Sequence, residues 1–168
     1  MGRGRAGRSG EAHMTDDMWT SRILEDQAGI DRLLAGARRI AVLGIRSEKV
    51  AHRPAHYVPA YLQEAGLDVI PVPVYEPEVV EILGRPVYRR IRDVPGEIDI
   101  VDVFRRPEDI PPHLEDILAK RPRAVWFQTG IRHDLSAESL AREGIWVVQD
   151  RCLMVEHRRW AALQRRGR

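Results

Sequence analysis

The sequence predicts an α/β domain built around a mainly parallel sheet of five strands. Short apolar runs recur along the chain, and the stretches between them carry apolar residues at helical spacing. Short apolar strands that alternate with helices are typical of parallel sheets covered on both faces. The predicted fold is therefore Rossmann-like and doubly wound, with helices on both faces of the sheet. The predicted strands are residues 40–45, 67–74, 98–104, 124–128 and 145–149.

The first half of the chain is predicted to contain two helices and one shorter helical turn. Residues 19–37 place apolar side chains at helical spacing and lead into the first strand. Residues 56–65 show the same spacing, and Gly66 follows them as glycine often follows a helix end. Residues 79–83 are expected to form a single helical turn before the third strand.

The second half is predicted to contain three helices. Residues 107–120 form the first, with prolines near its start, where the missing N–H does least harm. Residues 135–143 form the second, with Asp134 as its N-cap and Gly144 beyond its end. Residues 153–165 form the last helix.

Length and composition indicate one globular domain. The chain has 168 residues, of which 43% are hydrophobic, which is enough for one well-buried core. We expect the domain to span residues 18–160, between a disordered basic tail (1–17) and a second basic tail (161–168). No apolar run is long enough for a membrane span and no secretory signal is visible, so a cytoplasmic protein is expected. The single cysteine, Cys152, allows no intramolecular disulfide.

The distribution of charge argues against nucleic acid as a partner. Residues 1–10 contain three arginines and residues 158–168 contain five, and neither stretch contains an acid. Because the whole chain has a net charge of +2, residues 11–157 carry a net charge of −6. A nucleic-acid-binding domain should instead carry positive charge on its folded surface. An interaction protein that works through its arginine-rich ends is kept as a separate alternative.

The end of the first strand points to an anion site. A strand that delivers a loop to a helix N-terminus brings free backbone N–H groups and the positive helix end to one place. Basic and hydroxyl side chains in such a loop add charge-assisted hydrogen bonds. We therefore expect a phosphate-bearing ligand at this loop. Its candidate residues are Gly44, Ile45, Arg46, Ser47, Lys49 and Arg53.

The same loop departs from the glycine pattern of NAD-binding sites. Arg46 and Lys49 stand where that pattern has its second and third glycines. NAD sites also place an acid at the end of the second strand, whereas residues 72–74 read Val-Pro-Val and the nearest acid is Glu76. The sequence thus favours a 3′-phosphorylated adenosine. An NAD(P)-linked oxidoreductase, or another nucleotide-using enzyme, remains the alternative.

Two further strand ends carry residues suited to a ligand site. Phe104, Arg105 and Pro107 follow the third strand and offer an aromatic wall and a guanidinium group. Gln128 and Gly130 follow the fourth strand and offer a polar side chain and a position of close backbone approach. Because parallel strands end at one edge of a sheet, these residues should face one cleft together with the first loop. A purely structural role in the core or in a turn is the alternative for each.

Seven sequence blocks, in order, resemble the small stand-alone CoA-binding proteins. That family is similar to the CoA-binding domain of the succinyl-CoA synthetase α subunit, and the resemblance covers about residues 30–160. The blocks are residues 41–44, 53–58, 61–66, 70–72, 99–107, 125–130 and 150–157.

The resemblance implies a CoA-binding Rossmann domain and assigns the parts of the cleft. The first loop would hold phosphate, residues 72–74 would flank the adenine, and the third and fourth strand ends would line the pantetheine path. The family commonly has Pro-Val-Asn-Pro where residues 71–74 read Pro-Val-Pro-Val, so one amide contact is missing. The expected binding residues are Gly44, Ile45, Arg46, Ser47, Lys49, Arg53, Pro54, Tyr57, Val72, Pro73, Val74, Phe104, Arg105, Pro107, Gln128, Gly130 and Cys152.

No catalytic or metal-binding group is predicted. The related synthetases need a phosphorylatable histidine in a glycine-rich loop, and none of the six histidines here has that context. No nucleophile, base and orienting group form a set, and no residues show metal-ligand spacing. We therefore expect a protein that binds CoA or an acyl-CoA, more a binding protein than an enzyme. Trp160 is a candidate contact for a homodimer, and packing within one chain is the alternative.

Cys152 is the one residue with reactive chemistry at the expected cleft. It follows Arg151 at the start of the last predicted helix, and both features favour the thiolate form. One hypothesis is that Cys152 forms a mixed disulfide with the thiol of CoA. The alternative is a buried structural cysteine behind the fifth strand.

Overall fold

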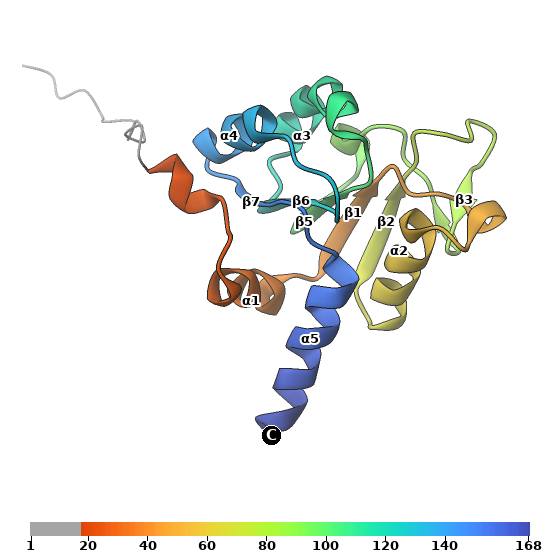
Figure 1. Cartoon of the computed structure of the whole chain (residues 1–168). Helices are drawn as coiled ribbons and strands as arrows, with labels where there is room; N and C mark the ends of the chain where they lie inside the picture. Colours follow the sequence, from red (N-terminus) through yellow and green to blue (C-terminus); the bar gives the residue numbers. More distant parts are fainter. Residues whose placement is uncertain (1–17) are drawn as a thin grey trace, which may run out of the picture.

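The protein folds around one parallel sheet of five strands, in the order β2-β1-β5-β6-β7 (Figure 1). The structure is a computed structural model that describes residues 18–168. The strands are β1 (Arg39–Leu43), β2 (Asp68–Val72), β5 (Ile100–Val103), β6 (Ala124–Phe127) and β7 (Trp146–Val148). The predicted fold class is thereby confirmed.

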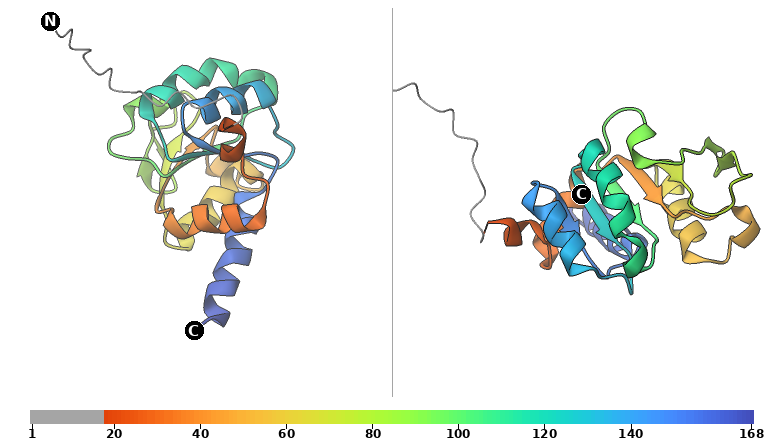
Figure 2. Two further views of the ribbon diagram at one scale, coloured as in Figure 1. Left: turned by 90° about the vertical axis from the view of Figure 1, so that its left-hand side faces the viewer. Right: turned by 90° about the horizontal axis from the view of Figure 1, so that it is seen from above.

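Helices cover both faces of this sheet (Figures 1 and 2). Helices α3 and α4 pack on one face, and α1, α2 and α5 pack on the other. The helices are α1 (Gln27–Gly36), α2 (Pro54–Glu64), α3 (Leu114–Lys120), α4 (Asp134–Arg142) and α5 (Leu153–Arg166).

The central strands are apolar on both sides because successive residues of a strand point to opposite faces. In β1, Ala41 and Leu43 join the apolar core under α3 and α4, whereas Ile40 and Val42 join the core under α1, α2 and α5. Each large apolar side chain buried in this way contributes about 1.5–3 kcal/mol. Two apolar cores, one on each face, therefore hold the three layers together.

The order of the strands reverses at β1. Strand β2 pairs with one side of β1, and β5 pairs with the other. The loops that leave the carboxyl ends of β1 and β5 therefore run to opposite sides, which opens a crevice between them.

The segment that precedes β1 is not the continuous helix that its spacing predicts. A short 3-10 helix, Trp19–Arg22, is followed by an extended stretch in which Leu24 N donates to the Val147 carbonyl at 2.8 Å. Helix α1 begins only after Asp26, whose side chain accepts from Gly29 N at 3.1 Å. The prediction over 19–37 was wrong because edge pairing with β7 and the Asp26 cap interrupt the helix.

The predicted helical turn at 79–83 is a hairpin instead. Strands β3 (Glu81–Ile82) and β4 (Arg85–Pro86) pair antiparallel around Leu83 and Gly84. Both turn residues have positive φ, +54° and +71°, which is the geometry that suits a two-residue hairpin loop. A leucine in the first of these positions gives no sequence signal for such a turn.

Helices α3 and α4 begin differently from the prediction. Two 3-10 turns, Pro107–Asp109 and Pro111–His113, precede α3 because proline lacks an N–H and disfavours a helical residue before it. Helix α4 is capped by the ring of His133, which accepts from Ser136 N at 3.1 Å, rather than by Asp134.

The two ends of the chain, residues 1–17 and 161–168, were predicted to be basic tails. Helix α5 continues through Arg166 and projects beyond the sheet, so most of residues 161–168 are helical (Figures 1 and 2). The expected disordered tail, 1–17, lies outside the described residues. No helix within residues 18–168 has both the length and the apolar character needed to cross a bilayer.

Candidate functional site

A cleft of about 700 Å³ lies at the carboxyl ends of β1, β5 and β6. The loops after these three strands form its floor, and the first turn of α2 and the N-cap residue of α5 contribute to its walls. Its size falls within the usual range for small-molecule sites. The lining residues are Gly44, Arg46, Arg53, Pro54, Ala55, Tyr57, Val58, Tyr75, Phe104, Arg105, Arg106, Pro107, Gln128, Thr129, Gly130, Ile131 and Cys152.

Gly44 forms the floor where β1 and β5 end side by side. Its φ is +86°, and its N–H donates to the Val72 carbonyl at 2.9 Å. A Cβ at this position would be driven into the carbonyl oxygen of Phe104 and would lie 3.1 Å from its carbonyl carbon. Only glycine therefore lets the two backbones approach this closely.

The loop after β1 is held in place by the start of α2. Arg46 N donates to the Ala55 carbonyl at 3.0 Å, and the Arg46 carbonyl accepts from His56 Nδ1 at 2.9 Å. Arg53 precedes Pro54, the first residue of α2, where the ring adds no unsatisfied N–H. These bonds fix Arg46 beside the cleft, and Arg53 lines the cleft as the N-cap residue of α2.

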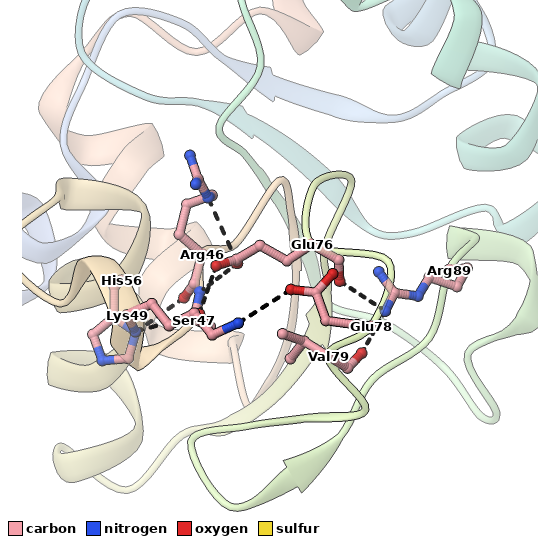
Figure 3. A network of polar contacts seen from close by, with 8 residues as sticks. All are labelled: Arg46, Ser47, Lys49, His56, Glu76, Glu78, Val79 and Arg89. Atoms are coloured by element: carbon pink, nitrogen blue, oxygen red, sulfur yellow. Dashed lines mark hydrogen bonds and ion pairs between the residues drawn. The ribbon is translucent and has the colours of Figure 1, made fainter.

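Glu76 reaches back from the loop after β2 and binds the loop after β1 (Figure 3). Its carboxylate accepts from Ser47 N at 3.0 Å and from Ser47 Oγ at 2.7 Å, and Arg46 Nε lies 3.7 Å away. Burial opposes ionisation of this carboxyl, but the Ser47 hydrogen bonds and the charges of Arg46 and Lys49 outweigh it and lower the pKa of Glu76. An acid therefore does stand beside the first loop, although it lies beyond the end of the strand.

An aromatic ring and two guanidinium groups form one wall of the cleft. The guanidinium carbons of Arg46 and Arg105 lie 5.0 and 5.3 Å from the centre of the Tyr75 ring, within cation–π range. Arg105 is also 3.8 Å from Asp109, and its side chain is only 12% exposed. The wall thus presents two guanidinium groups beside one aromatic ring.

The opposite end of the cleft contains a buried amide. Gln128 is only 4% exposed, and its Nε2 donates to Asp102 Oδ1 at 2.6 Å. No hydrogen bond within residues 18–168 engages the Gln128 amide oxygen, and this oxygen keeps some exposure in a residue that lines the cleft. This end of the cleft therefore offers a hydrogen-bond acceptor.

Asp102 lies beneath Gln128 and is fully buried in β5. Its second oxygen, Oδ2, has no hydrogen-bond partner in the described part of the chain. Burial raises the pKa of Asp102 from its ordinary 3.8 to about 7, although the hydrogen bond from Gln128 acts in the other direction. Burial thus favours the protonated form of this carboxyl.

Most of the residues that the sequence selected line this cleft, and some do not. Ile45, Val72 and Pro73 have buried side chains, and Ser47 is buried against Glu76. Lys49 Nζ pairs with Glu78 at 3.1 Å on the surface, and Val74 is exposed. The predicted residues that do line the cleft are Gly44, Arg46, Arg53, Pro54, Tyr57, Phe104, Arg105, Pro107, Gln128, Gly130 and Cys152.

The predicted set omits several cleft residues. The most informative is Tyr75, whose only sequence signal is an aromatic side chain just beyond the second strand. Glu76, which contacts the first loop but does not line the cleft, was named only as the acid nearest to the second strand, since the bend that returns it to Ser47 depends on its own φ of +60°. The other omitted lining residues are Ala55, Val58, Arg106, Thr129 and Ile131.

A doubly wound parallel sheet with a partly basic cleft at the ends of its strands defines a Rossmann-type ligand-binding domain. Residues 38–158 match the family described as CoA binding domain, and the chain belongs to this family. The resemblance drawn from the sequence blocks is thereby confirmed.

Similar proteins come from bacteria and archaea. The uncharacterized protein YneT of Bacillus subtilis (strain 168) is 34% identical over 131 residues, which are 78% of this chain and 93% of YneT. The structure of cell-free ID.343 from Thermus thermophilus has a TM-score of 0.74 and 43% identity, covering 81% of this chain and 99% of that one. The dinucleotide forming acetyl-coenzyme A synthetase 1 of Ca. Korarchaeum cryptofilum shares the fold, with a TM-score of 0.56 and 20% identity over 70% of this chain and 26% of that one.

Proposed function

We propose that the protein binds coenzyme A, free or as an acyl thioester, in the cleft at the carboxyl ends of β1, β5 and β6. Membership of the CoA binding domain family supports a CoA-related binding role. The observation that carries the finer proposal is the polarity of the cleft. Arg46 and Arg105 follow β1 and β5 and flank Tyr75, whereas Gln128 and Cys152 follow β6 and β7, farther along the order of strands.

This polarity matches the chemistry of CoA. The phosphates of the nucleotide carry negative charge that guanidinium groups neutralise with paired hydrogen bonds. The pantetheine arm is largely apolar but contains amide N–H groups, and the Gln128 oxygen is a fitting acceptor for one of them. The proposal is one of binding: the cleft offers guanidinium groups to the phosphates and an amide to the pantetheine arm.

Calorimetric titration of CoA, dephospho-CoA, acetyl-CoA and NAD tests this proposal. CoA is expected to bind most tightly of the nucleotides that lack an acyl group, because its 3′-phosphate adds a charge near the arginines. Equal affinities for CoA and dephospho-CoA would mean that the 3′-phosphate does not contribute to binding. Tighter binding of NAD would favour a dinucleotide-dependent enzyme instead.

A matched pair of arginine variants locates the site. R105Q should weaken CoA binding by about tenfold or more, since a charge-assisted bond to phosphate is lost. R165Q removes the same charge from the exposed end of α5 and should leave the affinity unchanged. Equal weakening in both variants would show attraction by net charge rather than a site.

Cys152 provides a covalent test of where the thiol of CoA lies. It lines the cleft at the N-cap position of α5 and is partly exposed. With CoA disulfide as the oxidant, the Cys152 thiolate would attack one sulfur, form a Cys152–CoA disulfide and release the other CoA as a thiolate. Intact-mass analysis should then show one CoA adduct on the native protein and none on C152S. An unmodified native protein would place the thiol elsewhere.

A further inference from the structure

The donors that the first loop offers to an anion are already engaged by a side chain of the same molecule. Ser47 N–H and Ser47 Oγ both donate to the carboxylate of Glu76, at 3.0 and 2.7 Å. Figure 3 shows this carboxylate between Ser47 and Arg46, at the centre of the polar network. Two donors and a nearby guanidinium, which are groups that also bind phosphate oxygens, are thus turned toward the Glu76 carboxylate.

The arginine beside this position is not fully satisfied by Glu76. Arg46 Nε lies 3.7 Å from the nearer carboxylate oxygen, and this buried nitrogen has no hydrogen-bond partner within residues 18–168. A buried donor without a partner is unfavourable, so a group that brings an acceptor closer to Nε gains that bond. The subsite therefore holds Glu76 with incomplete complementarity.

The backbone of Glu76 is fixed independently of its side chain. Val79 N donates to the Glu76 carbonyl at 3.0 Å, and the guanidinium of Arg89 donates to the carbonyls of Glu76, Pro77 and Val79. These bonds hold the loop whichever way the carboxylate points. A rotation of the side chain alone is enough to free the Ser47 donors.

We propose that Glu76 is an internal competitor for a phosphate group of the ligand at the Ser47 subsite. This inference takes CoA as the ligand from the proposed function. It adds that Glu76 limits the affinity for that ligand. Both groups are anionic acceptors of the same Ser47 donors, so binding of a phosphate there requires Glu76 to leave. The residue thereby sets how strongly the chain prefers ligands with a phosphate at this loop.

The proposal is tested with E76Q and with E78Q as its matched control. Both variants remove one acid from the same loop, but Glu78 pairs with Lys49 and does not contact Ser47. E76Q should bind CoA at least about tenfold more tightly than the unchanged chain. The side chain that the phosphate displaces from Ser47 is then a neutral amide and no longer a carboxylate. E78Q should leave the affinity within about twofold, as expected for an exposed pair.

A double variant shows whether the gain comes from the proposed donors. If E76Q acts by freeing the Ser47 donors, the gain should be clearly smaller in S47A/E76Q, which keeps the Ser47 N–H but lacks Oγ. Dephospho-CoA identifies which phosphate of the ligand the freed donors bind. If E76Q gains affinity for CoA alone, the 3′-phosphate is the group that binds at Ser47. If it gains equally for CoA and dephospho-CoA, the diphosphate is the group that binds there. Unchanged or weaker CoA binding by E76Q, or an equal gain in E78Q, overturns the proposal.

Inorganic pyrophosphate separates this inference from the CoA proposal. Added pyrophosphate should raise the melting temperature of E76Q more than that of the unchanged chain or of E78Q. If no variant binds CoA but this difference is found, the ligand assignment fails and the competitor role stands. If CoA binds and neither its affinity nor the pyrophosphate effect responds to E76Q, the competitor role fails and the ligand assignment stands.

Discussion

Replacing Gly44 by alanine is expected to destabilise the fold by about 3 kcal/mol or more. A residue with a Cβ at a φ of +86° is strained by roughly 1–3 kcal/mol. The new Cβ would also collide with the backbone carbonyl of Phe104, which has no rotamer to escape into. Such overpacking adds about 1–3 kcal/mol more, and the sum is a large share of the 5–15 kcal/mol typical of a domain.

Gly130→Ala is the matched control for Gly44→Ala. Gly130 also lines the cleft and has a φ of +80°, but a Cβ there would meet nothing within 4 Å. It should therefore show the backbone strain alone, roughly 1–3 kcal/mol, without the collision. Chemical denaturation of both variants measures the difference, and equal losses of unfolding free energy would mean that the contact with Phe104 is unimportant.

The strand ends were predictable because they follow from a simple geometric rule. Parallel strands end at one edge, so Gly44, Phe104 and Gln128 could be placed in one cleft although they are far apart in the sequence. Short, continuously apolar strands that alternate with helices likewise predicted a sheet covered on both sides, and β1 has apolar side chains on both faces. These features need only local pattern and topology.

The features that escaped prediction depend on single backbone conformations or on distant partners. Glu76 returns to Ser47 only because its own φ is positive. A glutamate in the sequence does not predict this backbone conformation. The Leu83–Gly84 turn is similar, since leucine rarely occupies that position. Lys49 looked like a phosphate ligand because the sequence does not show that Glu78 lies within 3.1 Å of it.

Asp102 was visible in the sequence as a polar interruption of an apolar strand, but its consequence for stability required the structure. It is fully buried, with one oxygen bound to Gln128 and the other without a partner in the described residues. Such a carboxyl is more easily accommodated when protonated than when ionised. The stability of the protein should therefore depend on pH through this residue.

We expect the contribution of Asp102 to the free energy of unfolding to fall as the pH rises from about 4 to about 7. The pKa of Asp102 is about 7 in the folded chain and 3.8 ordinarily. Between these values the unfolded chain loses the proton that the folded chain keeps, so unfolding becomes progressively easier. Below this window both states are protonated, and above it both are ionised, so the contribution is constant on either side. The full change amounts to roughly 4 kcal/mol as an upper bound.

D102N tests this expectation because asparagine keeps an acceptor for Gln128 and removes the titration. The unfolding free energy of D102N minus that of the unchanged chain should increase by several kcal/mol, at most roughly 4, between pH 4.5 and 8. D116N is the control, because hydrogen bonds from Arg90 and Arg92 lower the pKa of Asp116 despite its partial burial. Its carboxylate is ionised in both states above about pH 5, so the same difference for D116N should be flat in this range. A flat difference for D102N as well would mean that Asp102 stays ionised in the folded protein and has a compensating partner.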